Sequence, residues 1–288
     1  MGQLEGKVAV ITGSSRGLGY AIAEVYGREG ASLVLSARSE KQLQMGIETL
    51  KAKGYRVSGL PGDVGDLNAI RALAAHAVST YGKIDIWVNN AGLAGVFGPT
   101  ASAPVERYEK VLKTNIFGTY YGSITALDHF LPQRSGKLIN LLGRGDTKPV
   151  PLQNAYAPSK TWIRSFTLAL AKEYKDSGVG IFAFNPGIVD TEMMHRLEAT
   201  PGYETRLKPL STVIQLWGND PDVPAEKALW LASAATDGKT GLAVNVLSRP
   251  ELFTGALRFL ANKVLRRPQR DATLEIATVA RQDQPTSV

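Results

Sequence analysis

Short apolar runs that alternate with longer helical patterns constrain the fold of this chain more than any other feature of its sequence. The apolar runs span residues 7–12, 32–37, 55–60, 84–89, 137–142, 179–184 and 242–247. Several are apolar at both odd and even positions, which is typical of strands covered on both faces. Helical patterns separate them, at 17–29, 39–53, 67–80, 104–131, 154–176 and 224–235. The alternation predicts an α/β fold, in which helices cover both faces of a parallel sheet.

No linker or internal repeat divides this pattern, so residues 1–249 are expected to form one domain. Residues 192–223 interrupt the alternation with a long segment that has no strand pattern, which is typical of a substrate lid. Residues 250–288 form an extension, in which we expect a basic amphipathic helix over 250–267 and a frayed end over 268–288.

The composition excludes several classes of chemistry. The chain has no cysteine among 288 residues, which excludes disulfides, thiolate metal sites and a cysteine nucleophile. The three histidines form no recognisable metal-binding pattern, so no metal is expected. No run of eighteen apolar residues predicts a membrane span, and no secretory pattern is visible, so we expect a cytoplasmic protein.

The net charge of +7 is concentrated in part near the C-terminus. Residues 249–288 hold seven Lys or Arg and four Asp or Glu, and so carry +3 of that charge. No aromatic-interleaved basic stripe or nucleic-acid motif accompanies these basic residues. The charge therefore favours a solvated tail over a nucleic-acid or lipid surface.

A glycine-rich turn follows the first predicted strand, in the stretch "TGSSRGLG" over residues 12–19. Gly13, Gly17 and Gly19 allow a sharp turn and let backbone N–H groups approach a pyrophosphate at the start of a helix. The spacing Gly-x-x-x-Gly-x-Gly differs from the common dinucleotide fingerprint, Gly-x-Gly-x-x-Gly. By itself this turn is weak evidence for a cofactor, because a purely structural turn could have the same glycines.

Tyr156 and Lys160 are separated by four positions, so on a helix they share one face. A free tyrosine has a pKa near ~10, which is high for proton exchange at neutral pH. A neighbouring ammonium favours the phenolate, so we expect Lys160 to lower the pKa of Tyr156 toward neutrality. An isolated pair of this kind is more often found on a surface, but one beside a cofactor site could transfer protons.

Six motifs occur in one order along the chain, and each falls at a strand end or on a helix. They are "TGSSRGLG" (12–19), "DVGD" (63–66), "NNAG" (89–92), Asn115 in "KTNIFG", "YAPSK" (156–160) and "NPGIVDT" (185–191). In residues 5–247 the chain resembles the short-chain dehydrogenase/reductase family. The resemblance implies a seven-stranded, doubly wound Rossmann-type sheet, a nicotinamide cofactor, a small-molecule substrate and a homodimer or homotetramer.

The resemblance also implies roles for individual residues. Tyr156, Lys160 and Asn115 would be catalytic, with Asn115 at a helix distortion that holds a water relaying protons to the lysine. Asp63 and Val64 would border the adenine. The implied cofactor-binding residues are Gly13, Ser15, Arg16, Gly17, Leu18, Gly19, Arg38, Asp63, Val64, Asn90, Ala91, Gly92, Tyr156, Lys160, Pro186, Gly187, Ile188 and Thr191. The last four of these would hold the nicotinamide amide.

Charge at the end of the second predicted strand indicates which cofactor binds. Enzymes that use NAD usually place an acid there, to bind the ribose 2′-hydroxyl. Here that position is Ala37, and Arg38 follows it. Arg16, in the glycine turn, would face the same region in the family. Two guanidinium groups without a carboxylate favour the 2′-phosphate of NADPH over NADH.

Gly143 departs from the family pattern, because the family places a serine at this position, thirteen residues before the tyrosine. Three interpretations remain open. A substrate hydroxyl, a water or another side chain (Asp146, Thr147, Gln153 or Asn154) could replace the missing donor. Alternatively, glycine could make room for a bulky, already activated carbonyl. Lastly, the chain could bind NADPH without turnover. In an active enzyme, the substitution Gly143→Ser is expected to raise turnover.

The sequence thus predicts an NADPH-dependent reductase that acts on a medium-sized, partly apolar carbonyl compound or an activated C=C or C=N bond. The alternative is an NADPH-binding sensor or scaffold with impaired catalysis. His195 lies in the predicted lid, where an incidental role is favoured over a substrate contact. The candidate substrate residues are Gly143, Met193, Met194 and Trp217.

Overall fold

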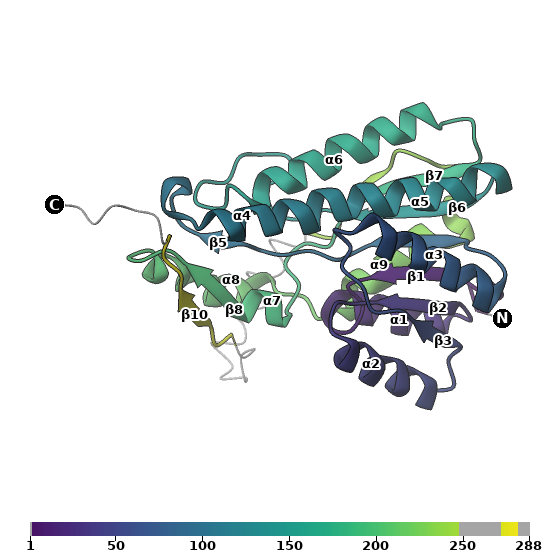
Figure 1. Ribbon diagram of the computed structural model, residues 1–288, viewed down its shortest axis with the longest axis horizontal. Coiled ribbons are helices and arrows are strands. Elements are labelled where there is room, and N and C mark those ends of the chain that lie inside the picture. The colour runs from purple at the N-terminus through teal and green to yellow at the C-terminus, as the bar shows by residue number, and fades with distance from the viewer. Residues whose placement is uncertain (1, 248–271, 282–288) are drawn as a thin grey trace.

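A seven-stranded parallel sheet forms the centre of the molecule (Figure 1). The computed structural model describes residues 2–247 and 272–281, so the predicted helix over 250–267 lies outside the described residues. The strand order is β3-β2-β1-β4-β6-β7-β9, and every neighbouring pair is parallel. The strands are β1 (Val8–Thr12), β2 (Ser32–Ser36), β3 (Val57–Gly59), β4 (Ile86–Asn89), β6 (Gly136–Leu141), β7 (Val179–Asn185) and β9 (Ala243–Asn245). The predicted Rossmann-type fold is confirmed.

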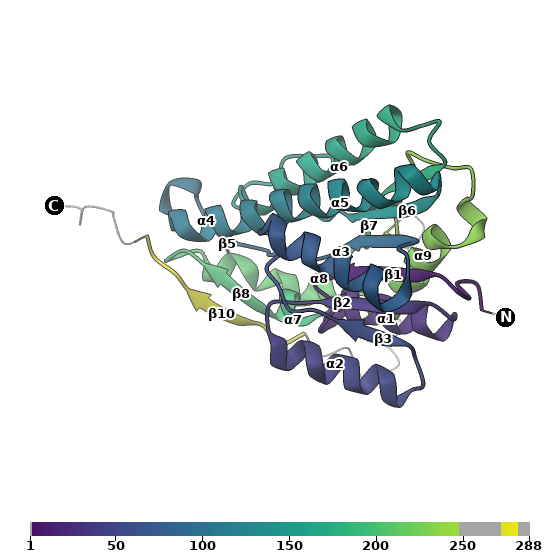
Figure 2. The ribbon, with the colours of Figure 1, turned by 45° about the vertical axis from the view of Figure 1, so that its right-hand side comes forward.

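Helices cover both faces of this sheet, and each face has its own buried core (Figure 2). One core joins the sheet to α1 (Gly17–Arg28), α2 (Glu40–Ala52) and α9 (Asp222–Ala232). The other joins it to α3 (Leu67–Tyr81), α5 (Gly118–Gln133) and α6 (Tyr156–Glu173). Ala9 and Ile11 belong to the first core and Val8 and Val10 to the second, so the strands are apolar at both parities.

The predicted helix over 104–131 is interrupted in the structure. α4 (Val105–Leu112) leads into one turn of π-helix, Lys113–Phe117, before α5 begins. A π-turn adds a residue to the helical ladder and often marks a functional position. Apolar periodicity could not reveal it, because the helix continues in the same direction on both sides of the turn.

The predicted lid, residues 192–223, is not structureless as the sequence suggested. It contains α7 (Glu192–His195), β8 (Arg196–Ala199), a 3₁₀ turn (Glu204–Leu207) and α8 (Pro209–Trp217). β8 is the middle strand of a second, three-stranded sheet whose outer strands are β5 (Val96–Phe97) and β10 (Glu275–Thr278). A four-residue strand carries too little pattern to be recognised, and its partners are distant in sequence.

The prediction of a frayed end was wrong for residues 272–281. β10 pairs in parallel with β8 over four residues, from Glu275 opposite Arg196 to Thr278 opposite Ala199. Tertiary pairing thus orders a segment that its position near the chain end suggested would be loose. Shorter 3₁₀ turns lie at Thr100–Ser102 and Ala234–Thr236. Among the described helices, none is long and apolar enough to cross a membrane.

The strand order reverses direction between β1 and β4, which are neighbours in the sheet. Loops that leave the carboxyl ends of these two strands run to opposite sides and open a crevice between them. Four of the six motifs noted in the sequence follow carboxyl ends of strands, so the topology gathers them at one edge of the sheet.

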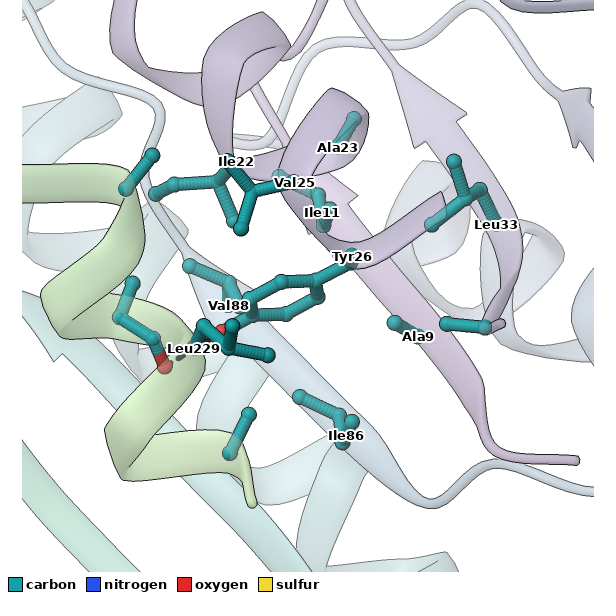
Figure 3. Packing of buried hydrophobic residues seen from close by; sticks show 14 of the residues in the cluster. Ala9, Ile11, Ile22, Ala23, Val25, Tyr26, Leu33, Ile86, Val88 and Leu229 are labelled. Carbon is teal, nitrogen blue, oxygen red and sulfur yellow. Dashed lines mark hydrogen bonds between the residues drawn. The ribbon is translucent and has the colours of Figure 1, made fainter. Parts of the chain in front are cut away.

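Tyr26 fixes α1 against α9 in the first core (Figure 3). Its ring is fully buried, and its hydroxyl donates a hydrogen bond of 2.9 Å to the carbonyl oxygen of Ala228. We expect Tyr26→Phe to lower the free energy of unfolding by about 1 kcal/mol, because a buried hydrogen bond is lost without a large cavity. Urea unfolding measures the change, with Tyr120→Phe at a 39 % exposed position as control. Equal stability of the two variants would contradict the assigned role.

Candidate active site

A cleft of about 960 Å³ opens at the carboxyl edge of the sheet, between the glycine turn and the lid. Most of the residues that the sequence assigned to cofactor and substrate line it. They are Gly13, Ser15, Arg16, Gly17, Leu18, Gly19, Arg38, Val64, Asn90, Ala91, Gly92, Tyr156, Lys160, Pro186, Gly187, Thr191, Met193 and Met194. Asp63, Asn115, Gly143, Ile188 and Trp217 are not among the lining residues. The structure therefore gathers most of the predicted cofactor residues and two of the predicted substrate residues, Met193 and Met194, in one cleft, and Trp217, at the end of α8, is outside its lining.

The glycine turn has the local geometry that a pyrophosphate site requires. Gly13 and Gly17 have φ of +64° and +58°, in the left-handed region that favours glycine. A Cβ atom on Gly13 would lie 2.7 Å from the Cα atom of Ala91, so no side chain fits there. Arg16 precedes α1, and its side chain forms no capping hydrogen bond with the first backbone N–H groups of this helix. This turn therefore fits the phosphates of a dinucleotide.

Asn90 attaches the glycine turn to the end of β4. Its side-chain amide donates to the carbonyl oxygens of Thr12 and Gly13, at 2.9 and 3.0 Å. Its backbone N–H donates to the Thr12 hydroxyl at 3.1 Å. The predicted role of Asn90 beside the cofactor region has a specific physical basis here, since three hydrogen bonds hold β1 and β4 together at the crevice.

The two arginines predicted near the 2′-phosphate differ in their surroundings. Arg38 is exposed and lines the cleft beside Ala37, at the end of β2. Arg16 instead forms an ion pair with Glu192 at the start of α7. Glu192 also pairs with Arg196, whose Nε lies 3.0 Å from Oε2 of Glu275. A chain of charges thus runs from the glycine turn through the lid to β10.

Asn115 lies within the π-turn and is fully buried. Its side chain accepts a hydrogen bond from the Leu93 amide at 2.8 Å and donates to the Leu93 carbonyl at 3.1 Å. It also donates to the Ser159 hydroxyl at 3.0 Å. Asn115 therefore binds the loop after β4 to the first turn of α6, which carries Tyr156 and Lys160.

Tyr156 and Lys160 begin α6 and face the inner end of the cleft. The Lys160 ammonium lies 5.5 Å from the centre of the Tyr156 ring and donates to the carbonyl oxygen of Leu141 at 3.0 Å. Lys160 is only 4 % exposed. The prediction that Tyr156 and Lys160 share one face of a helix is confirmed. Both side chains lie near the end of β6.

Burial decides the protonation of this pair. Removal from water and, to a smaller extent, the charge of Asp146 together raise the pKa of Tyr156 to about 12. Burial also lowers the pKa of Lys160 to about 8. The expectation that Lys160 would lower the pKa of Tyr156 toward neutrality is therefore wrong for this structure, because burial and Asp146 both favour the neutral phenol. At neutral pH, Tyr156 is a neutral phenol and Lys160 is mostly an ammonium.

Gly143 gives the Tyr156 hydroxyl the space that it occupies. A Cβ atom built on Gly143 would overlap this hydroxyl and would lie 3.5 Å from Cε of Lys160. Any side chain at position 143 must therefore displace the phenol. The sequence-based expectation for Gly143→Ser omitted this steric conflict, which depends on how α6 packs beside β6.

The side chains suggested as replacements for the missing hydroxyl do not line the cleft. Asp146 is buried, with an oxygen 3.5 Å from Nη1 of Arg164. Thr147 is exposed, and the amide of Asn154 donates to the Thr100 hydroxyl. Gln153 has a buried side-chain oxygen without a protein partner. None of the four thus presents a donor beside Tyr156 in the cleft.

His195 has a structural place in the lid. One ring nitrogen lies 2.5 Å from Oδ1 of Asp190, and the other lies 2.8 Å from the carbonyl oxygen of Thr273. It therefore joins the loop after β7 to the segment that leads into β10, which agrees with the expectation that it is not primarily a substrate contact.

Sequence reasoning missed part of the cleft wall. Arg107 and Lys110 of α4 line it, as do Glu275, Ile276 and Ala277 of β10. The stretch "TLEIATV", residues 273–279, is rich in β-branched residues, a composition that could have indicated a strand. Its position beyond the basic segment made a frayed end the simpler prediction.

Comparisons with known proteins agree with this geometry. A family model described as short chain dehydrogenase matches residues 7–202. The chain is 33 % identical to 3beta-hydroxysteroid dehydrogenase 1 of Eggerthella lenta over 254 residues, which cover 88 % of this chain and 96 % of that one. It is 31 % identical to glucose 1-dehydrogenase 2 of Bacillus subtilis, over 88 % of this chain and 98 % of that protein.

Solved structures show the same relationship. A variant actinorhodin polyketide ketoreductase with NADPH superposes with a TM-score of 0.76 and 28 % identity, covering 85 % of this chain and 97 % of that one. A 3-ketoacyl-(acyl-carrier-protein) reductase from Brucella melitensis complexed with NADH has a TM-score of 0.75 and 26 % identity, covering 84 % and 97 %. The chain belongs to the short chain dehydrogenase family. It is an NAD(P)-dependent oxidoreductase, whose glycine turn and cleft fit such a cofactor.

Proposed function

We propose that this protein is an NADPH-dependent reductase that transfers a hydride to the carbonyl group, or to an activated C=C or C=N bond, of a medium-sized and partly apolar small molecule. The observation that carries the proposal is the pair of Tyr156 and Lys160 at the inner end of a cleft whose other end is the glycine turn. Bound in this cleft, the reduced nicotinamide would supply the hydride.

Tyr156 would donate the proton to the oxygen that becomes negative as the carbonyl is reduced. A phenol with a pKa of about 12 keeps its proton at neutral pH and is therefore available as a donor. Lys160, as an ammonium below pH about 8, would stabilise the phenolate that remains. Asn115 would hold this pair in position through Leu93 and Ser159, and the π-turn around it would hold the water that relays protons to Lys160.

Gly143 would leave Tyr156 as the principal hydrogen-bond donor to the substrate oxygen. The phenol of Tyr156 occupies the space beside Gly143, the position at which the family has a serine. The Tyr156 hydroxyl therefore lies close to where the hydroxyl of that serine would be. The four suggested replacement side chains do not line the cleft. A substrate hydroxyl or a bound water would therefore supply the second hydrogen bond to the substrate oxygen, unless the carbonyl is already activated and needs none.

The charges at the adenosine end support NADPH over NADH. Arg38 lines the cleft beside Ala37, where a carboxylate would otherwise repel a phosphate. Arg16 is the second candidate, and it would have to leave Glu192 to reach a 2′-phosphate. Asp63, Val64, Pro186, Gly187, Ile188 and Thr191 keep their family-implied roles as proposals. A cytoplasmic location and a homodimer or homotetramer also stay predictions from the sequence.

The substrate half of the cleft supports a partly apolar ligand. Met193, Met194 and Leu197 of the lid line it, together with Leu93 and Leu142. The charged side chains of Arg107, Lys110 and Glu275 also line the cleft, so its lining suits a ligand that is only partly apolar.

NADPH is expected to bind at least about tenfold more tightly than NADH, because the guanidinium of Arg38 forms charge-assisted hydrogen bonds with a phosphate. Arg38→Asp should narrow or reverse the difference. Fluorescence titration of both cofactors measures it without turnover. Arg71→Asp, on the exposed surface of α3, changes the net charge equally and should leave the ratio unchanged. Equal affinities of the wild type for both cofactors would contradict the preference.

Substitution at Gly143 tests the contribution of Tyr156. Gly143→Ala should lower turnover by about tenfold or more, because its Cβ displaces the phenol. Gly143→Ser should exceed Gly143→Ala by about tenfold to a hundredfold, since it restores a donor. Tyr156→Phe should abolish reduction. NADPH oxidation with a broad carbonyl panel is the measurement.

Gly46→Ala in α2 is the control for these variants, since its Cβ would make ordinary contacts, the nearest at 3.6 Å. Retained turnover in Tyr156→Phe would overturn the mechanism. No turnover by the wild type with any carbonyl compound would favour the alternative, an NADPH-binding sensor or scaffold.

The pH dependence tests Lys160. Below its pKa of about 8 the side chain is charged and supports proton donation, so kcat/KM for reduction should fall as pH rises through about 8. The loss of this ammonium precedes that of the phenol proton, whose pKa is about 12. Lys160→Met should remove the inflection and most of the activity. Lys172→Met, exposed on the same helix, should keep the wild-type profile, and a flat wild-type profile would contradict the role.

A further inference from the structure

The second sheet brings the described C-terminal segment to the cleft. β10 pairs with β8 of the lid, and β8 pairs with β5, which follows the end of β4 (Figures 1 and 2). Three segments that are far apart in the sequence thus form one parallel sheet beside the cleft. The family match ends at residue 202, so β10 lies beyond the part of the chain that the family model describes.

Polar contacts hold β10 in place along its whole length. Most of them come from the lid, and one comes from the turn at Thr100–Ser102 that follows β5. The Val279 amide donates to Ala199, at 2.8 Å, which extends the pairing with β8 by one residue. The side-chain contacts are Arg196 with Glu275 (3.0 Å), His195 with the Thr273 carbonyl (2.8 Å), Thr278 with Glu204 (2.8 Å) and Arg281 with the Ala101 carbonyl (3.3 Å). Such a strand is a fixed part of the wall rather than a loose cover.

β10 contributes to the same cleft that contains Tyr156 and Lys160. Glu275, Ile276 and Ala277 all line it. Ile276 is half-buried, whereas its two neighbours in the strand are exposed. Its partner in the register is Leu197, which also lines the cleft. An apolar pair therefore stands on the wall that the lid and β10 share.

We propose that β10 is the outer wall of the substrate half of the cleft, and that Ile276 limits the length of the apolar chain that a substrate can carry. The inference rests on the proposed function, since it concerns substrates whose carbonyl group lies at Tyr156. The favoured ligand class is carbonyl compounds with an unbranched or flat apolar chain directed toward Leu197 and Ile276. Each methylene that fits such a wall strengthens binding, and each that does not is rejected.

The absence of cysteine from the chain makes a direct test possible. In Ile276→Cys and the matched control Ala280→Cys, the single thiol is labelled with hexyl methanethiosulfonate, which transfers its S-hexyl group and releases methanesulfinate. Ala280 is exposed and does not line the cleft. Turnover with NADPH is then measured for straight-chain methyl ketones from butanone upward.

The label at position 276 should lower kcat/KM for the longest ketones at least about tenfold more than for butanone, because it fills the space for their last methylenes. Dithiothreitol should restore the ketone series of the unlabelled Ile276→Cys variant, and the label at position 280 should change nothing. A loss that is equal for short and long ketones, or no loss, would overturn the length limit.

A second readout needs no turnover. The thiol at position 276 should react with a bulky maleimide at least about tenfold more slowly than the thiol at position 280, because its side chain is half-buried in the cleft wall. Equal rates would overturn the position of β10 and with it the inference. Slow labelling at position 276 without reduction of any ketone would overturn the proposed function and the length limit, yet would support the position of β10.

Discussion

The parallel arrangement of the central sheet is the constraint on which the rest of this structure depends. Parallel strands place all their carboxyl ends at one edge, and two buried cores fix the helices that follow them. Between β1 and β4 the loops diverge, and Asn90 holds the two strand ends together with three hydrogen bonds. These hydrogen bonds are present in the chain without a ligand, so the crevice is formed before one binds.

The chemistry at the inner end of the cleft depends on close packing. The π-turn at Asn115 places its amide between the loop after β4 and the start of α6, so the position of Tyr156 follows from a buried network rather than from a surface loop. The lack of a side chain at Gly143 then allows the phenol to approach β6. Burial keeps this phenol protonated, which suits a donor in a reduction.

The outer end of the cleft is built differently, from short strands and ion pairs. Glu192 links Arg16 of the glycine turn to Arg196 of β8, and Arg196 links to Glu275 of β10. Cofactor and substrate regions therefore share a set of charges at the surface. If Arg16 left Glu192 to bind a 2′-phosphate, Glu192 would still pair with Arg196. The contacts of Arg196 with Glu192 and Glu275 would then remain, and β8 and β10 could stay paired.

The α/β fold could be predicted from the alternation of apolar runs and helical patterns, and most of the cleft residues from the family resemblance of the six motifs. Two-sided apolar runs specify buried parallel strands, and the glycine spacing and the Tyr156–Lys160 interval are fixed by backbone geometry. The sequence could not determine the phenol's pKa, the space at Gly143 or the place of β10. Desolvation, steric overlap and strand pairing depend on segments that are distant in the sequence and come into contact only when the chain folds.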